Sequence, residues 1–570
     1  MLATLVLGAF VSRRPGRGLA MVLVGLFALW LLPVPGASQA TPYVPPLDPA
    51  YRDLEALVSA GLVREIIPGQ RPYSRLTFAR AAGEARAQLE AGGSVPKPRL
   101  AEALRRLEAG FAAELALLCE GGAEACPPAA SRPALREIAA DLTAASSPAR
   151  PIPDRELVPD PRGTGAELDA DVNPLLQRNQ GRALADGWTL GTEARAELGV
   201  GSHFAVQLHP RVQLSDGGDG AAVDASLVRG YVRGLFGNLS VDAGRNHVPH
   251  GAAREYGVAM SNNIRGMDMV RLSMERPARL PWIFRHLGPV ALTAYVGDLG
   301  RDRDTPGSKL IVIEGALRPH RNLELGGSLL NQQFGEGIPS ASLGERIRDV
   351  LGLLPRRWYY GFGSVGEISD KAVALDARLT LPAHGLDLYA EVLTTDDHDL
   401  FSGWHESLWN DAAWVWGGHL VGLGPEGRLD ARIEASRAGV RPYTHHHFTS
   451  GMTLDRRVMG TPLGPLAAGV TGTLEWNGAR QTVGMAWAWE RYSGDVYQKP
   501  GPNPVDQRLV RIADNPDEVR VRSTLDWTRQ PAPSGLRTTV RLGYEHVTRF
   551  DFTERNRSSF LAQVSVGYVW

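Results

Sequence analysis

Cysteine, blocks of like charge and long apolar runs are all scarce in this sequence. Its 570 residues include two cysteines, 61 basic and 62 acidic side chains. Without a concentrated basic surface the chain cannot neutralise many phosphates, which excludes a nucleic-acid-binding protein. A mean hydropathy of −0.17 excludes a membrane protein built from several apolar helices. It does not exclude a membrane β-barrel, because barrel strands alternate apolar with polar residues.

The one long apolar run lies near the N-terminus. A basic segment, residues 13–17, precedes an apolar run over 19–32, and small residues follow at 37–40. This order is typical of a secretory signal, so we predict a signal peptide over residues 1–40, cleavage after Ala40 and export. A transmembrane anchor is the alternative, but the 14 residues of the run fall short of the roughly 20 that span a membrane.

The two cysteines, Cys119 and Cys126, flank a short segment rich in glycine and alanine. Such a segment can close a loop, and an exported protein meets an oxidising compartment, so we predict a structural disulfide. Two cysteines with no histidine between them make a poor zinc site. The run His445–His447 is equally poor, since consecutive residues cannot all face one ion. We therefore predict no metal and no cofactor.

Residues 41–150 have helical periodicity, and we predict a periplasmic α-helical bundle over this range. Asp48 followed by Pro49 is typical of a helix start. Apolar residues then recur at helical spacing, and the predicted helices cover residues 49–61, 74–89, 98–119 and 133–145. A proline-rich stretch over residues 151–165 is predicted to be a linker.

The C-terminal segment predicts a membrane strand. In residues 560–570 every second side chain is apolar, and the segment ends on Tyr568 and Trp570. A soluble sheet strand can show the same alternation. A terminal aromatic residue on such a strand in an exported protein is, however, typical of bacterial outer-membrane barrels, whose last strand is recognised by the barrel-insertion machinery. We therefore predict that machinery and outer-membrane lipid as partners.

From Gly163 onward the apolar period changes to two. We predict a transmembrane antiparallel β-barrel of about 18 strands over residues 166–570, with its first strand at 166–172. Short turns and long loops alternate, as expected for periplasmic turns and outer loops. Side chains of both charges are predicted to face the lumen and pair across strands, which favours a plugged lumen over an open one. Examples are Asp387, Glu391, Arg428, Asp430, Arg432, Glu434, Arg520, Arg522 and Asp526.

The predicted outer loops are rich in aromatic and amide side chains. Rings can stack on sugar faces and amides can bind hydroxyls, so these loops are candidates for glycan binding. The candidate residues are Trp404, His405, Trp409, Asn410, Tyr492 and Tyr497. Asn331–Phe334 is a similar group at the end of another strand. Packing within the loops or in the aromatic girdles of a barrel is the alternative.

Several short motifs resemble one known family. They are residues 47–51, residues 71–75, Ser261, Asn262 and Asn263 after Met260, and residues 326–335. Together they are similar to Wzi-type capsule-assembly outer-membrane proteins, over about residues 42–570. The resemblance implies an outer-membrane barrel with a periplasmic helical bundle. It also implies a lectin-like protein that attaches exported polysaccharide to the cell, and not an enzyme.

We therefore expect a protein that binds and anchors capsular or surface polysaccharide at the bacterial outer membrane. A substrate-selective porin is the alternative, and it would conduct ions through an open lumen. No GxSxG elbow supports a hydrolase. The sequence leaves open which polysaccharide is bound, the oligomeric state, and whether the helical bundle plugs the barrel or binds a periplasmic partner.

Overall fold

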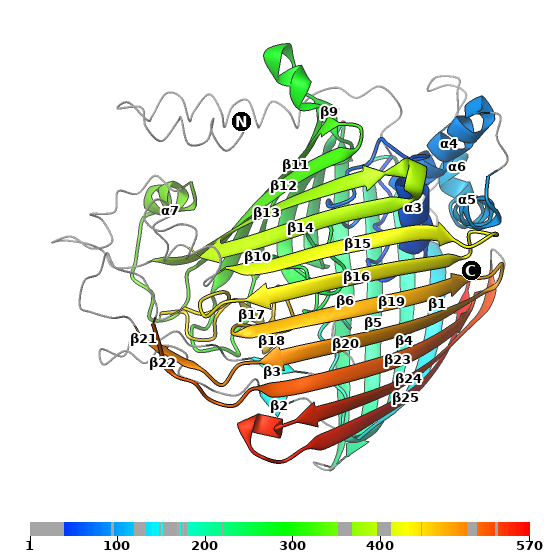
Figure 1. Ribbon diagram of the computed structural model, residues 1–570. Coiled ribbons are helices and arrows are strands. Elements are labelled where there is room, and N and C mark those ends of the chain that lie inside the picture. The colour runs from blue at the N-terminus through cyan, green and yellow to red at the C-terminus, as the bar shows by residue number, and fades with distance from the viewer. Residues whose placement is uncertain are drawn as a thin grey trace.

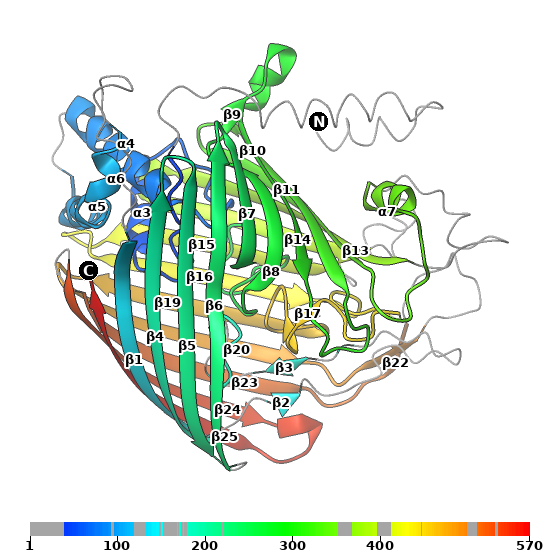
Figure 2. The ribbon, with the colours of Figure 1, turned by 180° about the vertical axis from the view of Figure 1, so that it is seen from behind.

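The fold is a closed β-barrel with several helices of the N-terminal region at one end (Figures 1 and 2). The computed structural model describes residues 39–92, 96–118, 133–146, 150–151, 168, 170–172, 175, 179–217, 220–351, 368–395, 412–445, 447–498, 510–530 and 534–570. None of the described helices is long and apolar enough to cross a membrane.

The main sheet has 19 strands, of which 18 form the barrel wall. Neighbouring wall strands are antiparallel, and β1 closes the ring by pairing with both β4 and β25. The wall strands are β1 (Pro133–Ala145), β4 (Gly187–Val200), β5 (Phe204–Gly217), β6 (Gly220–Phe236), β7 (Leu239–Asn246), β8 (Met267–Met274), β10 (Pro289–Asp298), β11 (Lys309–His320), β12 (Leu323–Gln333), β13 (Ser369–Leu381), β14 (Leu386–Thr395), β15 (Ala413–Leu423), β16 (Leu429–Ala438), β19 (Ala467–Asn477), β20 (Gln481–Tyr492), β23 (Glu518–Arg529), β24 (Gly535–Thr548) and β25 (Arg557–Val569). The remaining strand, β9 (Ala278–Arg279), pairs with the start of β10.

Short elements lie in the connections between the wall strands. Three two-stranded sheets among the described residues are β2 (Arg150–Pro151) with β3 (Asp171–Val172), β17 (Thr453–Leu454) with β18 (Arg457–Val458), and β21 (Val496–Gln498) with β22 (Val510–Ala513). The connections also contain helix α7 (Leu343–Val350) and the 3-10 helices η1 (Trp282–Leu287), η2 (Pro382–His384) and η3 (Phe550–Phe552).

The helix predicted over residues 133–145 is wrong, because these residues form β1. Leu135, Ile138 and Leu142 have helical spacing, yet all three are exposed on the strand, with exposed fractions of 41%, 48% and 54%. A β-bulge between Leu135 and Glu137 inserts an extra residue and brings Leu135 to the same side as Ile138. The bulge thus produces helical spacing within a strand.

The strand predicted at residues 166–172 is not part of the barrel wall. Among the described residues of that stretch, Asp171–Val172 is the strand, and it pairs with β2 in a separate sheet. Strand β1 lies beside β4 instead, so the count of 18 is confirmed while the barrel begins at Pro133. The other 17 predicted strands overlap the observed ones, with boundaries that differ by a few residues.

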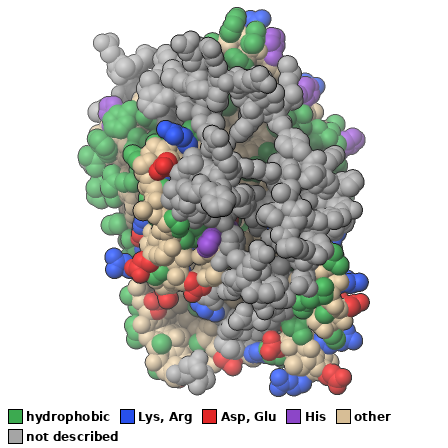
Figure 3. Space-filling model, turned by 90° about the vertical axis from the view of Figure 1, so that its left-hand side faces the viewer, with side chains coloured by type: hydrophobic (Ala, Val, Ile, Leu, Met, Phe, Trp, Pro, Cys, Tyr) green, Lys and Arg blue, Asp and Glu red, His purple; other side chains and the backbone are tan. Residues whose placement is uncertain are grey.

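The barrel wall alternates as predicted, with polar side chains inward and apolar side chains outward. On β16, Arg432 and Glu434 are 8% and 1% exposed, whereas Ile433 between them is 54% exposed. On β25, Phe560, Val564 and the other predicted apolar positions face outward in the same way. Figure 3 shows hydrophobic side chains along both flanks of the molecule. A wall that is apolar outside and polar inside is the pattern of a membrane barrel.

The two ends of the barrel differ in the lengths of their connections. One end has turns of a few residues, such as 237–238, 321–322 and 478–480, together with the longer connection 275–288. Long connections, such as 247–266 and 439–466, lie at the other end. Since bacterial barrels have short periplasmic turns and long extracellular loops, the first end is the periplasmic end.

The helical domain lies at the periplasmic end (Figure 1). It contains α3 (Ala50–Ser59), α4 (Arg75–Gly92), α5 (Pro98–Gly110) and α6 (Ala112–Leu115), packed around a buried aromatic and aliphatic core. The predicted helix over 98–119 is broken, because α5 ends at Gly110 and the short α6 follows Phe111. At the start of α3 the Asp48 carboxylate accepts the backbone N–H of Ala50 at 3.0 Å, as the sequence predicts for a helix start.

Several predictions fall outside the described residues. These are residues 1–38 of the predicted signal peptide, both cysteines of the predicted disulfide, and the predicted linker from residue 152 onward.

Candidate functional site

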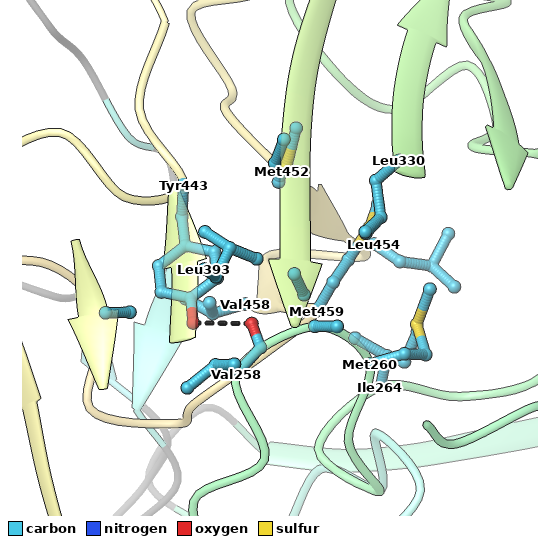
Figure 4. Packing of buried hydrophobic residues seen from close by; sticks show 14 of the residues in the cluster. Val258, Met260, Ile264, Leu330, Leu393, Tyr443, Met452, Leu454, Val458 and Met459 are labelled. Atoms are coloured by element: carbon cyan, nitrogen blue, oxygen red, sulfur yellow. Dashed lines mark hydrogen bonds between the residues drawn. The ribbon is translucent and has the colours of Figure 1, made fainter. Parts of the chain in front are cut away.

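Two outer loops fold back into the barrel lumen. The first inserted loop, residues 247–266, follows β7, and the second inserted loop, residues 439–466, follows β16. Their apolar side chains form one buried cluster with inward-facing residues of the wall (Figure 4). Val258 and Met260 come from the first loop, and Met459 from the second. The lumen at this level therefore holds a packed apolar core, where an open porin holds water.

Two wall carboxylates hold the first inserted loop. Glu391 of β14 accepts the backbone N–H groups of Ala253 at 2.7 Å and Val258 at 3.0 Å. Glu434 of β16 accepts the backbone N–H groups of residues 254–256 at 2.8, 2.9 and 3.0 Å. Both carboxylates are buried. Because charge-assisted hydrogen bonds are strong, these five contacts satisfy the polar backbone of the loop and fix its position.

Tyr443 connects the two inserted loops. Its hydroxyl donates to the Val258 carbonyl at 2.7 Å and accepts the backbone N–H of Thr461 at 3.2 Å. Figure 4 shows the ring within the apolar cluster and the hydroxyl directed at Val258. Each loop thus supports the other, and both form the outer plug of the barrel.

The motif residues Ser261, Asn262 and Asn263 also lie in this outer plug. The Ser261 hydroxyl donates to the Gly460 carbonyl at 2.6 Å, and the Asn263 amide donates to a backbone carbonyl of the second inserted loop at 3.0 Å. The Asn262 side-chain oxygen lies 2.9 Å from the ring of His247. Ser261 and Asn263 therefore hold the two inserted loops together, whereas the Asn262 contact lies within the first inserted loop.

The helical domain contacts the wall from the periplasmic end through buried ion pairs. Glu55 of α3 lies 2.8 Å from the Arg71 guanidinium and 2.9 Å from that of Arg432 on β16. Burial alone would raise the pKa of Glu55, but the charges of Arg71 and Arg432 outweigh it and hold this pKa below its ordinary value. Glu55 therefore stays ionised and ties α3 to the wall.

Further contacts surround the same mouth. The Tyr43 hydroxyl donates to Asp242 of β7 at 2.9 Å, and Gln70 donates to Glu314 of β11 at 2.7 Å. Lys97 donates to the Gly422 carbonyl, at the end of β15, at 2.9 Å. These contacts reach β7, β11 and β15, on different parts of the wall, so the helical domain is a periplasmic plug.

Between the two plugs lies an interior chamber of about 560 Å³. Its walls are residues 46–49 of the helical domain, part of the first inserted loop, and inward-facing side chains of β1, β4, β5, β19, β20 and β23–β25. The charges that line it are paired. Arg211 lies 2.6 Å from Glu193, and Arg541 lies 2.5 Å from Asp526. The chamber is therefore polar but carries no large excess of one charge sign, as predicted from the mixed charges of the strands.

The structure places the two described candidates for glycan binding differently. Tyr492 is 1% exposed, its hydroxyl donates to Glu490 at 3.1 Å, and the Arg520 guanidinium lies 4.1 Å from its ring centroid. This burial argues against direct sugar contact by Tyr492. Tyr497 lies on β21 at the outer end and is half-buried. The other four candidates, Trp404, His405, Trp409 and Asn410, lie outside the described residues.

The group Asn331–Phe334 also differs from its prediction. Asn331 and Gln333 are fully buried, and their amides donate to Asp349 of α7 at 3.0 and 2.9 Å. Phe334 is 37% exposed, with the Arg346 guanidinium 4.1 Å from its ring centroid. The amides therefore attach α7 to the wall, and Phe334 is the accessible member of the group.

The described histidines near His445 have a structural role. The His445 Nδ1 atom accepts the backbone N–H groups of His447 at 3.0 Å and Phe448 at 3.2 Å, which closes a turn. In the part of the chain that the structure describes, no group of three or more histidine, cysteine or acidic side chains is arranged to hold a metal ion.

Known proteins show which family this chain belongs to. A family profile described as capsule assembly protein Wzi matches residues 160–558. The chain belongs to this family. The match covers most of the chain, so the resemblance drawn from the short motifs is confirmed. No curated protein matches the sequence.

Solved structures of outer-membrane barrels are similar to this Wzi-family chain. One is Wzi of Escherichia coli, described as a carbohydrate-binding β-barrel involved in group 1 capsule assembly. It shares 16% identity and a TM-score of 0.60, over 92% of this chain and 98% of that one. OprD of Pseudomonas aeruginosa shares 12% identity and a TM-score of 0.40, over 77% and 97%. OccAB1 of Acinetobacter baumannii has 9% identity and a TM-score of 0.38, over 76% of this chain and 96% of that one. The Wzi structure supports the fold.

Proposed function

We propose that this outer-membrane protein binds exported capsular or surface polysaccharide at its outer face and keeps it attached to the cell. Membership of the Wzi family supports capsule assembly as its setting. The similar barrel of E. coli is described as carbohydrate-binding, which supports a carbohydrate as the ligand. The proposed activity is binding, without catalysis.

The observation that carries this proposal is that packed segments of the chain lie in the lumen at both of its ends. The outer plug occupies the lumen from one end, and the periplasmic plug covers the other. Packing of this kind hinders diffusion of solutes through the barrel. We therefore assign ligand binding to its outer surface. The substrate-selective porin gains no comparable support from the geometry.

We propose that the sugar contacts come from the outer connections. Tyr497 and Phe334 offer partly exposed rings on the described part of that face. The sequence predicts further contacts from Trp404, His405 and Trp409. Aromatic rings present broad apolar faces to sugar C–H groups, and the neighbouring imidazole and amide groups can bind hydroxyls.

We further propose that the protein is exported with the cleavable signal peptide 1–40 and inserted through recognition of its last strand. The apolar outward face of β25 ends on Tyr568, which is followed by Trp570, and both rings are exposed. Their ring centroids are 4.7 Å apart. Aromatic side chains at the end of the closing strand are expected both for recognition by the insertion machinery and for the aromatic girdle at the membrane interface.

The test is a deletion strain of the source bacterium. Surface polysaccharide is measured separately in the cell-associated fraction and in the culture medium. We expect the deletion to move polysaccharide from the cells to the medium without reducing the total, because synthesis and export are intact. If the deletion strain retains its polysaccharide on the cell, the proposal is wrong.

Complementation separates sugar contact from folding. The variant Tyr497→Ala combined with Trp404→Ala and Trp409→Ala removes three predicted ring contacts. The matched control is Trp416→Ala, which removes a 37% exposed outward-facing ring on β15. We expect the triple variant to shed polysaccharide and the control to retain it, with both present in the outer membrane in equal amounts.

A further inference from the structure

The connection between β8 and β10 differs from every other described turn at the periplasmic end. It covers residues 275–288, whereas its neighbours at 237–238 and 321–322 have two residues each. It contains β9 and η1, and η1 projects sideways from the rim of the barrel (Figures 1 and 2). A long insertion at an end of short turns calls for a physical reason.

The outer surface of η1 is apolar and exposed. Trp282, Ile283 and Phe284 follow one another in sequence, and their exposed fractions are 78%, 61% and 38%. Arg285 and His286, the next two residues, are exposed as well. In Figure 3 this projection is the apolar group at the top edge, with basic and histidine side chains beside it. Three exposed apolar side chains beside two basic ones are unusual on a surface that faces only water.

The position of η1 relates it to the lipid-facing wall. Val290 on β10 and Leu317 on β11 are register partners on the outward side of the wall. They are only 7% and 9% exposed, whereas Val296 and Ile313, farther along the same strands, are 45% and 37% exposed. Helix η1 lies against β11 at this point. The covered pair shows that the connection folds onto the lipid-facing side of the barrel.

The aromatic residues at the periplasmic rim are unevenly distributed. Phe204, Phe236, Trp476, Tyr568 and Trp570 are exposed at the periplasmic ends of their strands or, for Trp570, just beyond. These strands are β5, β6, β19 and β25. From β7 to β16 the outward residues at the same ends of the described strands are aliphatic, for example Leu272, Leu325, Leu379 and Leu388. The aromatic girdle is thus incomplete along this arc, and η1 projects from it.

We propose that Trp282, Ile283 and Phe284 form a phospholipid-binding anchor that inserts into the periplasmic leaflet of the outer membrane, where strands β7–β16 lack aromatic side chains. Tryptophan and phenylalanine prefer the membrane interface, and Arg285 and His286 lie where they can contact lipid phosphates. The anchor continues the lipid-facing wall around Val290 and Leu317, which is why lipid is the occupant. It fixes the depth and tilt of the barrel on a part of the wall away from Tyr568 and Trp570.

A fluorescent label tests this anchor directly. The variant Ile283→Cys is labelled with an NBD group, and the folded protein is placed in vesicles of phosphatidylethanolamine and phosphatidylglycerol. The control label is at Glu426→Cys, in the turn 424–428 of the same rim, where the native side chain is 66% exposed. The unmodified chain shows how much label Cys119 and Cys126 take up. Heat-modifiable migration confirms that each sample is folded.

We expect lipids with a nitroxide near the headgroup to quench the label at residue 283 at least about twofold more than the label at 426, as interfacial burial requires. Aqueous iodide should show the reverse order. If iodide reaches both labels equally in these protein-free vesicles, the lipid anchor is wrong, and a protein partner or a second copy of the chain becomes the occupant of this surface. Equal quenching of both labels by the lipid nitroxide also overturns the proposal, since it would mean that the whole rim lies in the membrane.

Discussion

The Glu434 carboxylate of β16 accepts the backbone N–H of Tyr256 at 3.0 Å, which joins the barrel wall to a loop inserted from the outer end. The same carboxylate accepts two further backbone N–H groups, and the Tyr256 hydroxyl donates to Glu490 of β20 at 3.1 Å. A loop held by wall carboxylates in this way is part of the barrel interior.

Substitution Glu434→Gln should loosen the outer plug. The amide cannot accept three N–H bonds as strongly as a carboxylate, and its own N–H groups face backbone donors, so we expect a loss of about 2 kcal/mol. Single-channel recording in a planar bilayer should show steady openings for the variant and none for the wild type. Ile433→Val, on the lipid side of the same strand, is the control and should show no channel openings. If a folded Glu434→Gln sample shows no openings, the proposed role of Glu434 in holding the outer plug is wrong.

Substitution Glu55→Gln should weaken the attachment of the helical domain, because it leaves Arg432 buried without its charge partner. We expect a loss of about 3 kcal/mol near neutral pH. The pKa of Glu55 is lowered in the folded protein, so its contribution is present above the ordinary carboxylate pKa and is lost as the pH falls through the lowered value. Urea unfolding as a function of pH should therefore show the two proteins converging in acid below the ordinary pKa. A constant difference down to strongly acidic pH would argue against the ion pair.

Substitution Gly61→Ala should disturb the contact between the helical domain and the barrel. Gly61 has φ +73°, which disfavours other residues, and a Cβ there would lie 2.8 Å from the Cβ of Pro382 in the turn after β13. We expect a loss of about 2 kcal/mol in unfolding experiments. Gly83→Ala in α4, where a Cβ meets nothing, is the matched control and should gain up to about 1 kcal/mol. Equal effects at the two sites would count against close packing at Gly61.

Substitution Tyr443→Phe should loosen the contact between the two inserted loops while the ring keeps its packing. It removes the hydroxyl that serves both Val258 and Thr461, and we expect a cost of about 2 kcal/mol because the Thr461 N–H is left buried. Hydrogen exchange followed by mass spectrometry should show faster exchange in segments 253–263 and 455–463. Unchanged protection there would show that the Tyr443 hydroxyl does not couple the two loops.

Much of the wall could be predicted from the sequence because period-two alternation has a direct physical cause, the lipid on one side and the polar lumen on the other. Ile433 between Arg432 and Glu434 is an example. Strand β1 escaped prediction because its bulge imitates helical spacing around Leu135. The direction of the inserted loops also could not be predicted, since their apolar residues have no regular period. Glu391 and Glu434 were recognisable as lumen-facing, but their backbone partners depend on loop positions that sequence spacing does not encode.

The contacts of the motif Ser261–Asn263 also could not be predicted from the sequence. Its residues identify the family, but the motif gives no sign that the Ser261 hydroxyl binds Gly460, some two hundred residues away. The glycan candidates were chosen by side-chain chemistry alone, and that chemistry does not distinguish Tyr497, which is half-buried, from Tyr492, which lies beneath Arg520. Burial of a ring depends on which loops fold inward, and that is decided by tertiary contacts.

The central claim is tested most directly by measuring whether surface polysaccharide from the source cell binds the purified, folded protein in lipid nanodiscs. Surface plasmon resonance should show saturable binding to the wild type and to Trp416→Ala, and much weaker binding to the variant that lacks Trp404, Trp409 and Tyr497. Absence of binding to a sample whose heat-modifiable migration shows a folded barrel, together with steady openings of the wild type in a planar bilayer, would contradict the account and favour a porin.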